Sequence, residues 1–365
     1  MNDRSWTPPK RIPYLDGLRA YSIAAVVLGH AKQFIPWFSS RAAIPVSALI
    51  GGRFGVRVFF VISGFLITTL LLKEASEDGR ISLSGFYERR IARIFPAFYT
   101  YLLIIIALTL LHAIDLHWPA LLTAATYTWN YGSLWGAPTA VAGEVLGHFW
   151  TVSLEEQFYL AWPACLIFFG IRWAERLAIA CVMFFPLFRL ISYFLFPETR
   201  GQLLMMFHTG SDQILWGAVT AFACQRGAID RVAKLKWGAA IPWVCGLIVF
   251  VLCPVLEAKV RGTSVIVNPS LECGSVALLI VWLLSAQGGP LRWALESWPM
   301  VQLGLLSYSL YIWQSFFILW DGVSFIPLPL RIVTALVFAI GSYRLIEIPM
   351  RRHIRGWFAQ SEPAH

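Results

Sequence analysis

The segment Leu15–His30 reads LDGLRAYSIAAVVLGH and opens the first long apolar run of the chain. The uncharged stretch AYSIAAVVLG separates Arg19 from His30. In an α-helix this eleven-residue step turns the chain by about 1100°, close to three full turns, over a rise of about 16 Å. We therefore expect both side chains on one face of a spanning helix, with Arg19 near the membrane surface and His30 near mid-bilayer. A titratable group at that depth is costly and predicts a functional site, the alternative being an imidazole hydrogen-bonded to a neighbouring helix.

The composition of the whole chain indicates a membrane protein. Of its 365 residues, 58% are hydrophobic and 13% are charged, whereas soluble domains carry about 25% charged residues. The formal net charge is +9, but the basic residues separate apolar runs and do not form a continuous stripe, so we expect no nucleic-acid partner. The six cysteines lie in or beside apolar runs and show neither a CxxC pair nor a zinc-ligand spacing. We therefore expect no metal and interpret them as small buried hydrophobes.

Eleven apolar runs approach the length of about 20 residues that one membrane crossing needs. They cover residues 16–37, 54–72, 94–113, 118–135, 150–171, 176–197, 203–224, 237–256, 271–287, 301–320 and 326–346. The weakest is 118–135, which is polar in its second half. If it does not cross, most of the 29 Lys and Arg residues fall on the cytoplasmic side, as the positive-inside rule requires.

The expected fold is therefore all-α, a polytopic helical bundle of about ten transmembrane helices plus a re-entrant or interfacial segment near 118–135. The first run is expected to remain as an uncleaved helix. We expect a single integral membrane domain over residues 1–365, with short cytoplasmic tails at 1–13 and 353–365.

Two further segments carry residue types suited to binding. Ser63 and Gly64 interrupt the bulky run FFVISGFLIT at 59–68, where small side chains let another backbone approach, for helix packing or for ligand contact. Arg90 and Arg93 lie in RRIARIFP at 89–96 and, being three apart, share a helix face. They could clamp phosphates or anchor the helix at the membrane surface.

A second histidine and a carboxylate occur in HFWTVSLEEQFYLAWP at 148–163. His148 and Glu155 could together orient an acceptor hydroxyl or tune each other's protonation. The alternative is a set of interfacial polar residues beside an aromatic belt that includes Trp150.

Two polar pairs elsewhere are spaced to meet on single helices. His208 and Asp212 are four residues apart, and Arg344 and Glu347 are three apart, so each pair could form a structural contact. The sequence holds no GxSxG elbow, P-loop, Rossmann glycine set or HExxH motif.

Six pieces, taken together, resemble the integral membrane acyltransferase-3 family of bacterial O-acyltransferases. They occur in the family's order across nearly the whole chain: LDGLRAYSIAAVVLGH at 15–30, FFVISGFLIT at 59–68, RRIARIFP at 89–96, HFWTVSLEEQFYLAWP at 148–163, LGLLSYSLYIW at 303–313 and YRLIEIPMRR at 343–352. Each piece is weak alone, but six in sequence are specific.

The resemblance implies acetyl-CoA or another acyl-CoA as the cytosolic donor and a carbohydrate or glycoside hydroxyl as the acceptor. It maps the family's Arg-x10-His pair to Arg19 and His30, and its basic cytoplasmic motif to Arg90 and Arg93. The carboxylate of the family's motif falls on Glu155.

The chain departs from the family's pattern at two points. Many members carry histidine where Gln314 stands, so we expect no second imidazole at that position. We also expect none of the appended extracytoplasmic hydrolase-like domains that some members carry, which leaves open whether a partner completes the transfer.

The resulting hypothesis is a multi-pass O-acyltransferase of the bacterial cytoplasmic (inner) membrane, with both termini cytoplasmic. Arg19, Arg90 and Arg93 would hold the phosphates of the coenzyme, and His30 would take the proton of the attacking hydroxyl.

Five other side chains have supporting roles in this hypothesis: Ser63 and Tyr308 would steady the oxyanion, and Glu155, His148 and Trp150 would position the acceptor. Direct transfer and an acyl-histidine intermediate both remain open.

A transporter or flippase of a lipid-linked glycan, with His30 and Glu155 as a proton relay, is the rival hypothesis from another class of protein. A structural membrane scaffold is a third hypothesis. The acceptor, the acyl chain and the oligomeric state are not predicted.

Overall fold

The structure is a computed structural model that describes residues 11–40, 44–136, 139–286 and 288–361. Regular structure in these residues is helical, without β-strands, so the predicted all-α class is confirmed. The α-helices are α1 (Pro13–Ala31), α2 (Ile44–Leu49), α3 (Gly52–Glu77), α4 (Leu83–Leu110), α5 (Trp118–Ala125), α6 (Ala140–Leu146), α7 (Phe149–Phe169), α8 (Ile171–Leu195), α9 (Phe207–Gly210), α10 (Asp212–Gln225), α11 (Ala228–Ala233), α12 (Ile241–Leu247), α13 (Cys253–Lys259), α14 (Thr263–Ile266), α15 (Asn268–Ser285), α16 (Pro290–Glu296), α17 (Trp298–Ile318), α18 (Leu328–Ser342) and α19 (Ile348–Ser361).

Within the described residues, six helical segments are long and apolar enough to cross a membrane. They are Gly52–Glu77, Leu83–Leu110, Ile171–Leu195, Gly238–Lys259, Asn268–Ser285 and Leu328–Ile354. Each of the six overlaps a predicted run, although α4 begins well before the run at 94–113. Helices α1, α7 and α17 also fall on predicted runs, with lengths of 19, 21 and 21 residues, but they are not among these six segments. The chain is thus an all-α, multi-pass membrane protein, while the number of about ten crossings stays a prediction.

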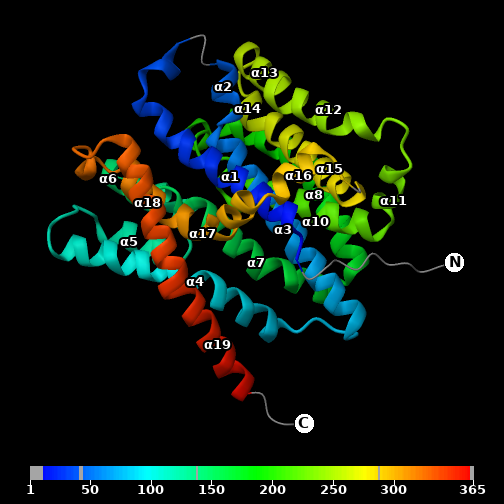
Figure 1. Cartoon of the computed structure of the whole chain (residues 1–365), viewed down its shortest axis with the longest axis horizontal. Helices are drawn as coiled ribbons and strands as arrows, with labels where there is room; N and C mark the ends of the chain where they lie inside the picture. The colour runs from blue at the N-terminus through cyan, green and yellow to red at the C-terminus, as the bar shows by residue number, and fades with distance from the viewer. Residues whose placement is uncertain (1–10, 41–43, 137–138, 287, 362–365) are drawn as a thin grey trace. The chain divides into compact units, whose positions relative to one another are not determined.

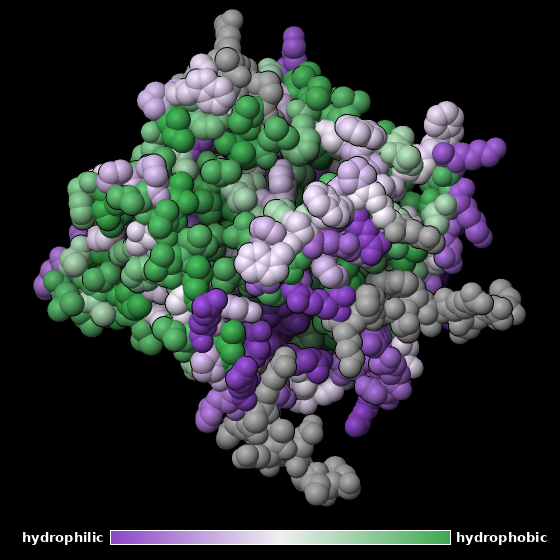
Figure 2. All heavy atoms as spheres, in the orientation of Figure 1, coloured by the Kyte–Doolittle hydropathy of each residue, from purple (hydrophilic) through white to green (hydrophobic). Residues whose placement is uncertain are grey.

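The surface of these helices explains why the chain needs lipid around it. Large apolar side chains such as those of Phe168, Phe184 and Trp243 are exposed, and Figure 2 shows wide hydrophobic areas on the molecular face that it displays. In water such areas would be an aggregation hazard, whereas lipid tails solvate them at no cost.

By their internal contacts the residues divide into two compact units. Unit 1 comprises Met1–Gly29, Ile35–Ile81 and Leu154–Leu305, and unit 2 comprises His30–Phe34, Ser82–Ser153 and Leu306–His365. The single functional domain over 1–365 stays a prediction. Most of the predicted N-terminal tail lies outside the described residues, and α19 continues through Ser361 into the range predicted as the C-terminal tail.

Helix α3 is the core element of unit 1, and it packs most closely against α10 (Figure 1). A Cβ on Gly64 would lie 1.9 Å from the backbone oxygen of Ile214, and a Cβ on Gly217 would lie 2.0 Å from that of Val61. Only glycine permits this approach, because any side chain would overlap the facing backbone. The packing role predicted for the small residues at 63–64 is confirmed for Gly64.

Unit 1 also buries charged side chains in pairs. Arg189 of α8 and Asp212 of α10 form a bidentate pair at 2.6 and 2.9 Å, and both are 0% exposed. The expected contact between His208 and Asp212 is not what the structure shows: the carboxylate binds the arginine, and the His208 ring lies against Phe188. An arginine satisfies a buried carboxylate better, because its planar fork matches both oxygens.

Unit 2 is built on α4, which packs against α19 and the segment before it (Figure 1). Ser82 caps the N-terminus of α4 by accepting a hydrogen bond from the backbone amide of Gly85. Helices α18 and α19 are joined by a π-helical segment, Tyr343–Glu347, so the three segments form one continuous helix. The run at 118–135 folds as the eight-residue α5 followed by a 3-10 segment, Trp129–Trp135. Neither piece is long enough to span a bilayer, in agreement with its exclusion from the crossings.

Candidate active site

His30 lies in the last turn of α1, because the helix ends at Ala31 rather than continuing to residue 37 as the apolar run predicts. The chain proceeds in short 3-10 segments that begin at Lys32 and Pro36. Proline lacks the amide hydrogen that a continuing helix would need. Helix α1 still contains both Arg19 and His30, as expected from their spacing.

In unit 2 the imidazole of His30 is held by an amide that is distant in sequence. Nδ1 of His30 lies 2.8 Å from Oε1 of Gln314 on α17. The Gln314 side chain is fully buried, whereas His30 is half-buried. Nε2 of His30 has no hydrogen-bond partner within the part of the chain that the structure describes. An imidazole held by an amide through one ring nitrogen is chemically able to accept a proton on the other.

His148 provides a second imidazole in the same unit, near enough to His30 for the two rings to interact electrostatically. Its ring is buried against Tyr101, Phe149 and Tyr311, with centroid separations of 5.8, 4.6 and 5.5 Å. Among the described residues neither ring nitrogen makes a hydrogen bond of normal geometry, although the backbone of Ile312 is nearby. The ring therefore retains unused hydrogen-bonding capacity within the described residues.

The backbone at His148 is fixed by hydroxyl groups. The Tyr311 hydroxyl donates to the carbonyl of His148 at 3.0 Å and lies 2.6 Å from Oγ1 of Thr151. The predicted acceptor-binding residue Trp150 lies on α7, between His148 and Thr151 in the sequence, and is half-buried. Tyr311 and Thr151 were not predicted, since hydroxyl and aromatic residues are common throughout the sequence.

Tyr308, predicted to steady an oxyanion, directs its hydroxyl elsewhere. It donates to the backbone carbonyl of Ile94 on α4 at 2.9 Å. A tyrosine has one hydroxyl hydrogen, so in this state it is not available to an oxyanion. Tyr308 therefore links α17 to the helix that carries the predicted phosphate-binding arginines.

Arg90 and Arg93 are both half-buried on α4. The Arg90 guanidinium lies over the ring of Phe86 at 5.7 Å. Arg93 is within electrostatic range of Glu347, which accepts a hydrogen bond from Ser309 and lies 3.6 Å from Arg351. The expected pairing of Glu347 with Arg344 is replaced by these contacts, because the π-helical turn before α19 changes which side chains share a face.

The remaining predicted residues belong to unit 1. Arg19 lies 3.3 Å from Oδ1 of Asp16, whose other oxygen pairs with Arg11 at 2.9 Å. Asp16 thus offsets part of the positive charge that the prediction assigns to phosphate binding. Only 15% of the Arg19 side chain is exposed, so this pair lies in a largely enclosed setting.

Ser63 and Glu155, from α3 and α7, are in direct contact. The Ser63 hydroxyl donates to Oε1 of Glu155 at 2.5 Å and accepts from the Tyr159 hydroxyl at 3.1 Å. From the sequence, Ser63 is predicted to steady an oxyanion and Glu155 to position the acceptor. A hydrogen bond between the two side chains is not predicted. In this arrangement Ser63 holds the carboxylate, since its single donor is already engaged.

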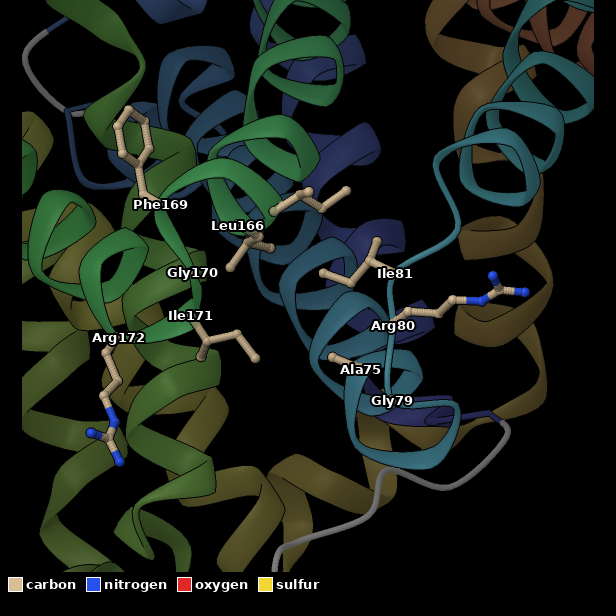
Figure 3. A pocket seen from close by; sticks show the side chains of 10 residues that line it. Ala75, Gly79, Arg80, Ile81, Leu166, Phe169, Gly170, Ile171 and Arg172 are labelled. Atoms are coloured by element: carbon tan, nitrogen blue, oxygen red, sulfur yellow. The ribbon is translucent and has the colours of Figure 1, made fainter.

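A cavity of about 540 Å³ lies in unit 1 beside the loop after α3 and the junction of α7 with α8. Figure 3 shows Leu166, Ile81 and Ile171 around it, while the side chains of Arg80 and Arg172 extend away from it. None of the predicted catalytic or coenzyme-binding residues lines this cavity.

The fold defines a class, the all-α multi-pass membrane proteins. The family model of an acyltransferase domain matches residues 12–343, and the chain belongs to this acyltransferase-3 family. The match confirms the family resemblance drawn from the six motifs.

Curated relatives agree with this assignment. The chain is 27% identical over 363 residues to the O-acetyltransferase OatA of Staphylococcus aureus strain NCTC 8325 / PS 47, a match that covers 94% of this chain and 58% of the relative. It is 28% identical over 373 residues to a putative O-acetyltransferase of S. aureus strain COL, covering 93% and 57% of the two chains. The chain thus spans somewhat more than half the length of these relatives. No solved structure matches it.

Proposed function

We propose that this protein is an O-acyltransferase that moves an acyl group, most simply acetyl, from cytosolic acyl-CoA to a hydroxyl of a carbohydrate or glycoside such as a cell-surface polysaccharide. The family match and the O-acetyltransferase names of the relatives support the reaction class. The proposed location is the bacterial cytoplasmic membrane with both termini inside, from the distribution of basic residues.

The observation that carries the proposal is the half-buried His30 imidazole, with Nδ1 on the Gln314 amide and Nε2 without a partner among the described residues. In the transfer, the acceptor oxygen forms a bond to the thioester carbonyl carbon and the carbon–sulfur bond breaks. Nε2 takes the proton from the attacking hydroxyl and returns it to the departing thiolate. A positioned base of this kind contributes about 10²- to 10⁴-fold to the rate.

Other side chains support the two substrates. Arg90 and Arg93 provide positive charge for the phosphates of the coenzyme. Arg351 adds to it, because it lies close to Glu347, the carboxylate that Arg93 also faces. Neither ring nitrogen of His148 has a hydrogen-bond partner among the described residues, so the ring could hydrogen-bond the hydroxyl of the acceptor. Glu155, held by Ser63, is proposed to act on the acceptor as well.

A direct assay tests the proposal. Purified protein in liposomes is given acetyl-CoA with a labelled acetyl group and bacterial polysaccharide fragments, and free thiol and labelled polysaccharide are both measured. We expect transfer by the native chain and a loss of about 10²-fold or more in His30→Ala, with coenzyme binding retained. His208→Ala removes an imidazole that faces Phe188 and serves as the matched control.

The same assay separates the enzyme from a transporter or flippase of a lipid-linked glycan. Such a protein would move its substrate across the liposome membrane without releasing thiol from acetyl-CoA. Native activity in His30→Ala would remove this histidine from the mechanism.

A further inference from the structure

We propose that Gln314 is a positioning residue that holds His30 in the tautomer in which Nε2 is the base, an inference that rests on the acyl transfer proposed above. Oε1 of Gln314 and Nδ1 of His30 are 2.8 Å apart. A carbonyl oxygen can only accept a hydrogen bond, so Nδ1 carries the ring hydrogen. Nε2 consequently keeps its lone pair on the nitrogen that has no partner within the described residues.

The stretch of α17 that carries Gln314 is rigidly fixed in unit 2. Trp313 packs against Tyr101 and Phe338, with ring centroids 5.3 Å away in each case. Ser315 donates to the backbone carbonyl of Glu144 at 2.8 Å. Anchors on both sides leave the amide little freedom to follow the imidazole, so the imidazole must adopt the orientation that the amide sets.

A purely structural role does not account for this glutamine. Its Nε2 is buried and makes no hydrogen bond within the described part of the chain. Burying an unsatisfied amide is costly, and an apolar side chain of similar size would avoid the cost. The contact that the residue does make is the one to His30.

The hydrogen bond should strengthen as the reaction proceeds. When Nε2 takes the proton of the acceptor hydroxyl, the ring becomes an imidazolium and its bond to Oε1 becomes charge-assisted. An interaction that is stronger in the transition state than in the ground state raises kcat and leaves substrate binding nearly unchanged.

The test compares two variants of the full-length chain. Gln314→Met keeps the size of the side chain and removes the acceptor, whereas Gln314→Glu keeps an acceptor at the same distance. We expect Gln314→Met to lower kcat by about 10-fold or more, with KM for acetyl-CoA within about twofold, since hydrogen bonds to charged groups have this magnitude. Gln314→Glu should retain most of kcat and move the acid limb of the pH–rate profile to higher pH, because a carboxylate favours the protonated ring.

A matched control is available in unit 1. Gln213 is also buried, and its amide donates to the backbone carbonyls of Leu204 and Gly210 at 3.2 and 3.0 Å. Gln213→Met should lower the thermal midpoint without changing the pH profile of the folded protein. Rates are normalised to the fraction of each variant that binds desulfo-CoA, a donor analogue without the reactive sulfur.

Three results would overturn the proposal. One is a native kcat in Gln314→Met. Another is an equal loss of kcat in Gln314→Met and Gln314→Glu, which is expected if the Gln314 amide nitrogen donates a hydrogen bond to Nδ1 of His30. If Gln314→Met does not fold, ¹⁵N NMR of histidine-labelled native protein, with His30→Ala to assign the signal, decides the question. A protonated Nδ1 in the neutral ring supports the proposal and a protonated Nε2 overturns it.

Failure of this inference differs from failure of the proposed function. A native chain that transfers no acyl group contradicts the proposed function. Native transfer that depends on His30 but not on Gln314 contradicts only the positioning role.

Discussion

The hydroxyl of Ser63 donates to the carboxylate of Glu155 at 2.5 Å, which links α3 to α7 inside unit 1. The contact unites two motifs that are 92 residues apart and that sequence patterns alone place in separate roles. It makes the carboxylate's position dependent on the serine, so the two residues should act as one group.

We therefore expect the effects of Ser63→Ala and Glu155→Gln on kcat/KM to be strongly non-additive. Each single change breaks the same charge-assisted hydrogen bond, and the coupling free energy should be about 1.5–3 kcal/mol. A double-mutant cycle on acyl transfer measures it. Ser76→Ala, which removes an exposed hydroxyl that donates to the Lys73 carbonyl, is the control. Additive effects would show that the two residues act independently.

The basic residues of α4 predict a difference between long and short acyl donors. Arg90→Gln and Arg93→Gln should raise KM for acetyl-CoA severalfold, because each removes a charge that attracts phosphate. The same variants should use S-acetylpantetheine, which lacks the phosphoadenosine end, as well as the native protein does. Steady-state kinetics with both donors provides the measurement.

Arg80→Gln is the matched control for these variants, since it removes one positive charge whose side chain extends away from the nearby cavity (Figure 3). An equal loss with both donors would assign Arg90 and Arg93 to folding or topology instead of phosphate binding.

The buried pair of Arg189 and Asp212 predicts a large effect on stability. Asp212→Asn leaves a guanidinium without its counter-charge in a fully buried site, which typically costs about 3–5 kcal/mol. The pair of Arg53 and Glu257 is the contrast, because its side chains are 75% and 52% exposed. Glu257→Gln should cost less than about 1 kcal/mol. Thermal unfolding in detergent compares the two, and similar midpoints would contradict the assigned difference.

Close packing of α3 against α10 predicts that even one methyl group is too large at residue 64. Gly64→Ala should destabilise unit 1 by about 1–3 kcal/mol or more, because the new Cβ overlaps the Ile214 backbone, which cannot rotate away. Gly341 on α18 has open space around it, so Gly341→Ala should be nearly neutral. Yield and thermal midpoint are the measurements, and an unchanged midpoint in Gly64→Ala would rule out the tight contact.

Several features of the fold could be predicted because they depend on local sequence. Apolar length and charge spacing identified the helical class, and the six candidate crossings fall on predicted runs. The weak run at 118–135 was separated from the others by its polar second half. A packing role could be predicted for Gly64 because a residue without a side chain, set within a bulky run, lets a neighbouring helix backbone come close.

The partners of the polar residues could not be predicted in the same way. Spacing suggested Asp212 with His208 and Glu347 with Arg344, but their partners come from elsewhere in the chain or from a different helical face. A helix presents several residues at each spacing, and burial decides which of them must be satisfied.

The sequence by itself determined that this chain is a helical membrane protein and, through six ordered motifs, which family it belongs to. These properties follow from composition and local order, which need no knowledge of distant contacts. Only the tertiary structure decided that His30 meets Gln314 and that Ser63 meets Glu155, at separations of 284 and 92 residues. Contacts between side chains so far apart depend on how helices pack, because packing alone brings their buried faces within hydrogen-bond distance.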